Sequence, residues 1–193
     1  MKVKIKELAT IQMGYSFRSR LEASTNGDVA VIQMKDLFDN NVVCCDELSK
    51  IDMERVKDHH LVKREDLIFR SRGLVTTSAI LLKETGKAVV AAPLLRIRIT
   101  KPGILLPQYL NWYISQREAQ IYLTSRSEGT ALKKISKQTI EDMEIALPTL
   151  KTQREIVEFA SLARQEQNLL LSLAEKRKQY ISTLLMQYAK GEK

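Results

Sequence analysis

The sequence predicts an α+β protein in which a mixed globular domain, residues 1–150, is followed by one long helix in residues 151–193. Up to about residue 148, short apolar runs alternate with turn residues, as in a domain of short strands and helices. No proline follows Pro148, and glycine returns only at Gly191. Beyond residue 152, apolar residues recur at spacings of three, four and seven, which is typical of a helix with one apolar stripe.

Three segments of the first domain have the pattern of strands. Residues 29–34 form an apolar run after the turn signal at 26–28, and residues 67–69 form another that Gly73 closes. The clearest strand is 95–99, where aliphatic residues alternate with Arg96 and Arg98. The alternation predicts that the aliphatic side chains face the core and that the two arginines face solvent.

Residues 108–123 are predicted to form one helix. Leu110, Tyr113, Ile114 and Ile121 fall at helical spacing after Pro107. The pair Gly129 and Thr130 is then expected to open a loop.

The C-terminal helix is predicted to begin at Thr152, because Thr152 and Glu155 have the spacing of a capping box. About 36 residues at 1.5 Å each give a rod of about 54 Å, too long to bury its stripe on one small domain. Self-association into a homodimer is therefore favoured over docking on the first domain, with parallel and antiparallel pairing both open. The predicted dimer contacts are Ile156, Ala163, Leu170, Leu173, Ile181 and Leu184.

Charge indicates a polyanionic partner. The chain has 31 Lys and Arg against 23 Asp and Glu, a formal net charge of +8. Residues 28–58 are acidic overall, whereas residues 63–101 contain nine basic and three acidic residues. This asymmetry favours a nucleic-acid footprint over a merely solvated surface. No uncharged stretch of the sequence is long enough to span a membrane, and Cys44 and Cys45 are adjacent, so a reducing, cytoplasmic location is expected.

Motifs for catalysis are missing from the sequence. It contains no glycine-rich phosphate loop, no Gly-x-Ser-x-Gly and no helical His pair with an intervening Glu. His59 and His60 are vicinal, as are Cys44 and Cys45, and vicinal pairs are poor metal-ligand spacings. We therefore expect no catalytic residue, no metal and no cofactor.

Three basic, polar stretches predict DNA contacts instead. Residues 14–20, 69–73 and 125–134 combine arginines or lysines with hydroxyl groups and glycine, and the first two also contain aromatic residues. Such residues fork onto guanine edges, bond phosphates and stack on bases. The predicted DNA-binding residues are Tyr15, Arg18, Arg20, Arg70, Arg72, Arg126, Thr130, Lys133 and Lys134.

Several stretches, in this order and spacing, resemble the DNA-specificity subunit of type I restriction-modification systems. They are residues 5–8 and 14–18, 31–37, 61–73, 106–110, 129–131, and 145–148 followed by Gln153 and Ile156. Subunits of this family usually carry two domain-plus-helix units in tandem, whereas this sequence holds one, without an internal repeat.

The resemblance implies that a homodimer rebuilds the two-unit architecture, with each chain reading one half-site of a split palindromic target on double-stranded DNA. It also implies a DNA adenine methyltransferase partner subunit, and it allows a motor-nuclease subunit. Two alternatives stay open on the sequence: a coiled-coil assembly or adaptor protein with an incidental basic face, and an autonomous modification enzyme.

Overall fold

The computed structural model describes residues 2–17, 24, 27–37, 41–53, 56–73, 76–129 and 134–191. The chain divides into two compact units, Met1–Arg154 and Glu155–Lys193. The first unit combines three small sheets with helices, and a 40-residue helix, α4 (Leu150–Ala189), begins in it. The predicted α+β fold with a long C-terminal helix is therefore confirmed. No helix in the described part of the chain is long and apolar enough to cross a membrane.

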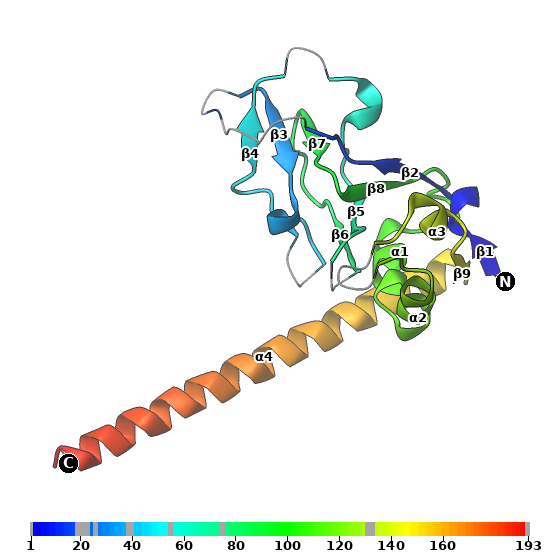
Figure 1. Ribbon diagram of the computed structural model, residues 1–193. Coiled ribbons are helices and arrows are strands. Elements are labelled where there is room, and N and C mark those ends of the chain that lie inside the picture. The colour runs from blue at the N-terminus through cyan, green and yellow to red at the C-terminus, as the bar shows by residue number, and fades with distance from the viewer. Residues whose placement is uncertain are drawn as a thin grey trace. The chain divides into compact units, whose positions relative to one another are not determined.

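The largest sheet is antiparallel and has the order β2-β8-β5-β6 (Figure 1). Its strands are β2 (Ala9–Met13), β8 (Leu94–Ile99), β5 (Leu67–Arg70) and β6 (Ser78–Ile80). The runs at 67–69 and 95–99 are thus strands, as predicted. In the register of the sheet, Arg96 of β8 lies opposite Gln12 of β2 and Ile68 of β5.

A second sheet has the order β4-β3-β7, formed by β4 (Ser49–Ile51), β3 (Val29–Ile32) and β7 (Ala88–Val90). β3 is antiparallel to β4 and parallel to β7. The predicted strand at 29–34 is confirmed in its first four residues, after which a 3-10 helix, η2 (Met34–Asp36), begins. All four residues of β3 are buried, so its two faces contact separate apolar clusters of the core.

The first and last strands of the unit close it. β1 (Lys2–Lys4) pairs with β9 (Glu144–Ala146), and a 3-10 helix, η1 (Ile5–Glu7), follows β1. A short helix, α3 (Lys137–Glu141), precedes β9, and Ser136 caps it by accepting a hydrogen bond from Thr139 N. Because β1 and β9 are 140 residues apart, this pairing fixes the start of the chain beside the entry to α4.

The predicted single helix at 108–123 is wrong: two helices, α1 (Pro107–Ile114) and α2 (Arg117–Ser125), occupy the region. Gln116 is extended, with ψ of 155°. The side chains of Ser115, Gln116 and Gln120 bond to the carbonyl groups of Asn111, Trp112 and Ile114, respectively. These side chains satisfy carbonyl groups that a continuous helix would have bonded, so α1 can end there.

The predicted start of the long helix at Thr152 is also wrong by two residues. α4 begins at Leu150, and Thr149 Oγ1 accepts a hydrogen bond from Thr152 N at 3.2 Å. The threonine that caps the helix is therefore Thr149, because a cap oxygen must reach an amide two or three residues later.

The arginine face of β8 does not face solvent, contrary to the sequence prediction. Arg96 is 6% exposed, and the side chain of Arg98 is 25% exposed. Arg98 forms a two-pronged ion pair with Asp66, at 2.7 and 2.6 Å. Chain segments cover both arginines, and their hydrogen bonds replace the water that the alternation pattern had implied.

Candidate nucleic-acid interface

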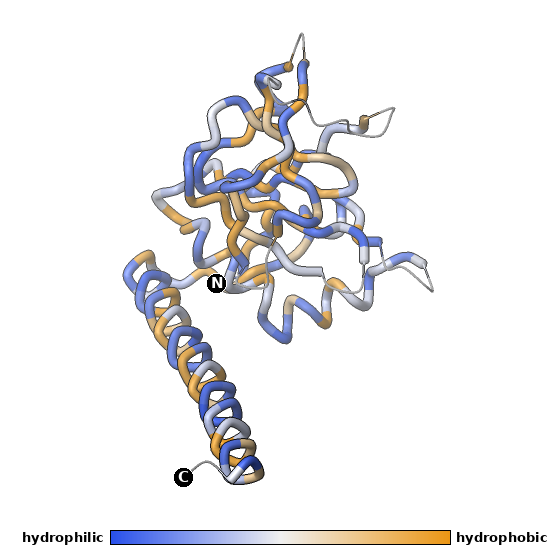
Figure 2. Tube along the Cα trace, turned by 90° about the vertical axis from the view of Figure 1, so that its left-hand side faces the viewer, coloured by the Kyte–Doolittle hydropathy of each residue, from blue (hydrophilic) through white to orange (hydrophobic). Residues whose placement is uncertain are grey.

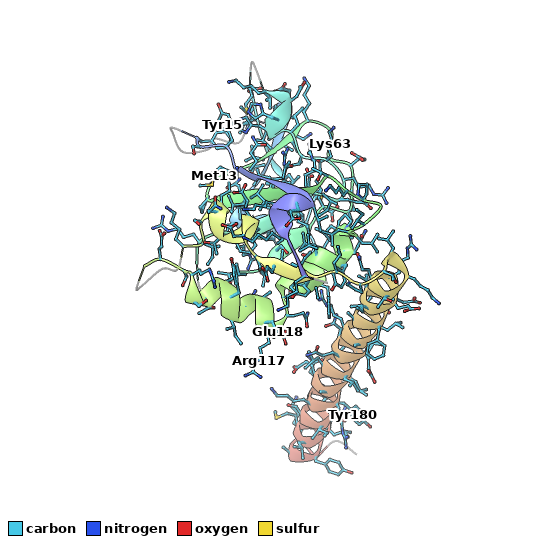
Figure 3. The ribbon with its side chains drawn as sticks, turned by 90° about the vertical axis from the view of Figure 1, so that its right-hand side faces the viewer. Met13, Tyr15, Lys63, Arg117, Glu118 and Tyr180 are labelled. Atoms are coloured by element: carbon cyan, nitrogen blue, oxygen red, sulfur yellow. The ribbon has the colours of Figure 1, made fainter. Side chains whose placement is uncertain are left out.

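The first basic stretch is attached to the turn formed by residues 91–94. Gly14 N donates to Leu94 O at 2.8 Å, and Tyr15 N donates to Val90 O at 2.6 Å. Ala92 N in turn donates to Tyr15 O at 2.9 Å. Tyr15 lies just beyond the end of β2, close to Met13 (Figure 3).

Glycine is needed at position 14 for this attachment. A Cβ atom on Gly14 would lie 2.7 Å from the carbonyl carbon of Ala91 and 2.8 Å from Leu94 O. Both are backbone atoms that cannot rotate away. Gly14 therefore allows the close approach that places Tyr15 against the turn.

The second basic stretch contacts the same turn. The buried hydroxyl of Ser71 donates to Pro93 O. Arg70 is half-buried and donates through Nη2 to Leu37 O, whereas Arg72 is exposed. Gly73 then has a φ of +127°, a conformation that favours glycine.

The third basic stretch pairs with the second. Ile135 N donates to Ser71 O at 2.8 Å, and Arg72 bridges to Lys134 in an antiparallel pair. Lys134 also pairs with Glu128, through backbone hydrogen bonds of 3.0 and 2.9 Å. The guanidinium of Arg126 lies 3.9 Å above the Tyr122 ring.

The structure thus brings together three stretches that are far apart in the sequence. We call this set the basic loop cluster, defined by residues 14–17, 70–73, 126–129 and 134. Its exposed cations are Arg72, Arg126 and Lys134. Within the described ranges, none of these three forms an ion pair, so their charges are available to a polyanion. Among the other predicted DNA-binding residues, Arg18, Arg20, Thr130 and Lys133 lie outside the described residues.

Two histidines adjoin the cluster, which the sequence did not indicate. His60, at the end of η3 (Asp58–His60), packs edge-on against Tyr15, with ring centroids 5.3 Å apart and an interplanar angle of 81°. The ring centroid of Phe17 lies 4.8 Å from that of Tyr15, and the ring centroid of His59 lies 4.3 Å from that of His60. Tyr15 and His60 are 45 positions apart, and no motif links them.

A cavity of about 620 Å³ adjoins the basic loop cluster at Arg126 and lies between β1, α2 and β9. Its charged lining is balanced, with Lys2, Lys4 and Arg126 against Glu118, Asp142 and Glu144. Hydrogen bonds from Lys6 and Gln138 lower the pKa of Asp142 to about 2. In the described part of the chain, no group of three or more His, Cys, Asp or Glu side chains is arranged to hold a metal ion.

The second unit is a helix with exposed apolar side chains. Leu170, Leu173 and Ile181 are 60%, 64% and 46% exposed. With Ala174, Arg177 and Tyr180 they line a shallow groove along the helix. Figure 2 shows apolar residues recurring along this helix between polar ones, and Figure 3 labels Tyr180 among them. Ile156 and Leu184 are half-exposed, and Ala163 is exposed.

Three solved structures have a similar fold. The S subunit of the type I restriction-modification system from M. genitalium is 12% identical, with a TM-score of 0.57 over 91% of this chain and 41% of that chain. The HsdS subunit from Thermoanaerobacter tengcongensis is 20% identical, with a TM-score of 0.62 over 86% of this chain and 37% of that chain. A structure that describes complex assembly and conformational transition of the type I R-M system is 19% identical, with a TM-score of 0.67 over 88% of this chain and 39% of that chain.

This chain spans about two fifths of the length of each of these proteins. No curated protein sequence matches it. Residues 1–170 match the family described as the type I restriction modification DNA specificity domain. The matched residues include the basic loop cluster and the first half of α4. The chain therefore belongs to the family of type I restriction modification DNA specificity domains.

Proposed function

We propose that this chain is a non-catalytic DNA-specificity subunit, in which the basic loop cluster reads one half-site of double-stranded DNA. The observation that carries the proposal is the attachment of three basic stretches to one another around the turn at 91–94. DNA recognition needs cations that position the phosphates and side chains that reach base edges from one face. Arg72, Arg126 and Lys134 supply exposed cations, and Tyr15 supplies an aromatic edge.

The arginines of the cluster have different expected roles. Arg72 is exposed, so its guanidinium can fork onto the O6 and N7 atoms of a guanine. Arg70 is half-buried and bonded to Leu37 O, so we expect it mainly to hold the loop. Arg18, Arg20, Thr130 and Lys133 belong to the same basic stretches and stay in the proposal as DNA contacts.

We further propose that α4 forms a homodimer through its apolar stripe. Leu170, Leu173 and Ile181 are each about half exposed or more in one chain, and a second helix with the same stripe would bury them. Apolar side chains line this groove together with three cationic ones, Lys176, Arg177 and Lys178. In such a dimer, two identical basic loop clusters read two identical half-sites.

The partner subunit in this proposal is a DNA adenine methyltransferase, with a motor-nuclease subunit as a further partner. Family membership supports this assignment, since the similar structures concern the S subunit and the complex assembly of type I systems. The specificity subunit would supply the target sequence and the methyltransferase would supply the chemistry.

The deciding experiment is co-purification of the full chain with its methyltransferase subunit, followed by sequencing of the methylated sites. One methylated motif that depends on the chain supports the proposal. Arg72→Ala should relax one position of that motif, whereas Lys134→Ala should weaken methylation at every site equally. Methylation that is independent of the chain would leave the adaptor interpretation, in which α4 alone carries the function.

A further inference from the structure

Two arginines of β8 hold the backbone of the segment that carries His59 and His60 by hydrogen bonds. Arg96 Nη1 donates to His59 O at 3.0 Å and to Leu61 O at 2.8 Å. Arg98 Nη2 also donates to Leu61 O, at 2.9 Å. Asp66 is paired with Arg98, so two cations and one anion lie beneath this segment. These charge-assisted hydrogen bonds fix the position of the backbone at residues 59–61, and the excess of cations keeps the local electrostatic potential positive.

A hydrogen-bond relay then fixes the protonation of His60. Arg96 Nη2 is always a donor, and it bonds to Gln12 Oε1 at 2.9 Å. The amide nitrogen of Gln12 therefore faces His60, with its Nε2 atom 3.3 Å from His60 Nδ1. An amide NH₂ can only donate, so His60 Nδ1 must accept. In a neutral imidazole, the proton is then on Nε2.

The neutral form of His60 is favoured at this position. Burial lowers the pKa of His60, and the nearby charges of His59, Lys57 and Arg96 lower it further. Protonation would also place a second donor on Nδ1, opposite the amide donor of Gln12. His60 thus has one polar group left, the Nε2–H donor, and no hydrogen-bond partner for it is found among the residues that the structure describes.

We propose that His60 is a further specificity-determining residue, whose Nε2–H donates a hydrogen bond to an acceptor on a base edge. The inference rests on the proposed function, because the DNA-reading surface is the basic loop cluster that Tyr15 joins to His60. A neutral donor gains less from a phosphate than a cation does, whereas a donor of fixed direction suits a base edge. Guanine, adenine and thymine present acceptors in the major groove, and the cytosine amino group does not.

The test compares side chains that keep or remove the donor. The full chain is used to select duplexes from a random-sequence pool in the presence of competitor DNA. Gln can place an amide N–H near the position of Nε2, whereas the shorter Asn cannot reach it. We expect His60→Asn to lose about 2- to 13-fold discrimination at one motif position, which is the range of one hydrogen bond between neutral groups. His60→Gln should retain most of it, and His59→Asn, a matched control outside the relay, should keep the motif.

Two results would overturn the inference. One is an unchanged motif in His60→Asn, and the other is uniform weakening at all positions, since that pattern belongs to a phosphate contact. A wild-type chain without any sequence preference would overturn the proposed function itself, and the role of His60 with it.

The tautomer provides a readout that does not depend on DNA. In ¹⁵N NMR spectra of the full chain at neutral pH, His60 should carry its proton on Nε2. In Gln12→Glu, a carboxylate oxygen would face Nδ1 and draw a proton onto it, so the Nδ1 signal should change to that of a protonated nitrogen. A wild-type His60 protonated on Nδ1 would refute the relay, whatever the selection experiment gives.

Discussion

The side-chain oxygen of Gln153 accepts a hydrogen bond from the backbone N–H of Leu106 at 2.9 Å. The amide nitrogen of Gln153 donates to Ile104 O at 2.8 Å and to Pro148 O at 2.9 Å. Gln153 is fully buried in the first turn of α4. One side chain therefore satisfies three backbone groups at the approach to α1 and at the start of α4.

Replacing Gln153 with Ala should lower the free energy of unfolding by about 2–4 kcal/mol, because it removes the partner of three backbone groups and leaves the buried position of the Gln153 side chain empty. Chemical denaturation measures this difference. Gln165→Ala, at an exposed position of the same helix, serves as the control and should change stability by less than about 0.5 kcal/mol. Equal effects of the two substitutions would contradict the role of Gln153.

Gly14→Ala should both destabilise the chain and reduce DNA retention. The new methyl group would lie under 3.0 Å from backbone atoms of Ala91 and Leu94, so either Tyr15 or the turn must move. Overpacking of this kind costs about 1–3 kcal/mol. Gly103→Ala is the matched control, since a Cβ there meets no atom within 4 Å. Thermal unfolding and DNA retention are measured on both variants.

Local patterns predicted β3, β5, β8 and the long helix, but they did not predict what covers these elements. Alternation identified β8 correctly, yet Arg96 is buried because Gln12 and the segment at 59–61 bond to it. These partners lie 35 to 84 positions away. Periodicity alone therefore cannot distinguish an arginine that faces solvent from one that faces a covering loop.

The candidate site, too, could be predicted from the sequence only in its local features. Its basic stretches could be found from composition, because arginine, serine and glycine cluster locally in each. Their mutual attachment depends on the turn at 91–94, and the proximity of His60 to Tyr15 depends on that attachment. The break between α1 and α2 was likewise missed, since it depends on carbonyl groups that Ser115, Gln116 and Gln120 satisfy.

Lys133→Ala combined with Lys134→Ala should flatten the salt dependence of DNA binding. Each phosphate neutralised contributes a slope of about −0.9 to log affinity against log salt, so the slope should become less negative by about 2. Sequence preference should stay unchanged. Lys101→Ala, an exposed lysine outside the basic loop cluster, is the control. A slope that stays the same in the double variant excludes both lysines as phosphate contacts.

Charged residues in place of Leu170 and Leu184 should convert a dimer into monomers. Leu170 is 60% exposed in the single chain, and in a dimer it would be buried, where an unpaired charge is costly. Light scattering of Leu170→Glu combined with Leu184→Glu gives the mass directly. Ser172→Glu adds a charge on an exposed position outside the stripe and should leave the mass unaltered. A dimer that persists in the double variant would place the interface elsewhere.

The DNA target of a homodimer should be split and palindromic. A closed pair of identical chains has a two-fold axis, and the axis of the protein is mirrored in the DNA as an inverted repeat.

The unread spacer between the half-sites follows from the helix. The 40 residues of α4 extend over about 60 Å at 1.5 Å per residue, enough to span half-sites one DNA turn apart, about 34 Å centre to centre. If a different specificity chain paired through the same stripe, the heterodimer should read an asymmetric site.

Motif mapping in a strain that carries this specificity chain alone tests the symmetric case. Two identical half-sites are expected, and Arg72→Ala should relax both of them at the same position, because each comes from the same residue in a different subunit. Relaxation of one half-site alone, or a reproducible non-palindromic motif, would falsify the homodimer as the reader.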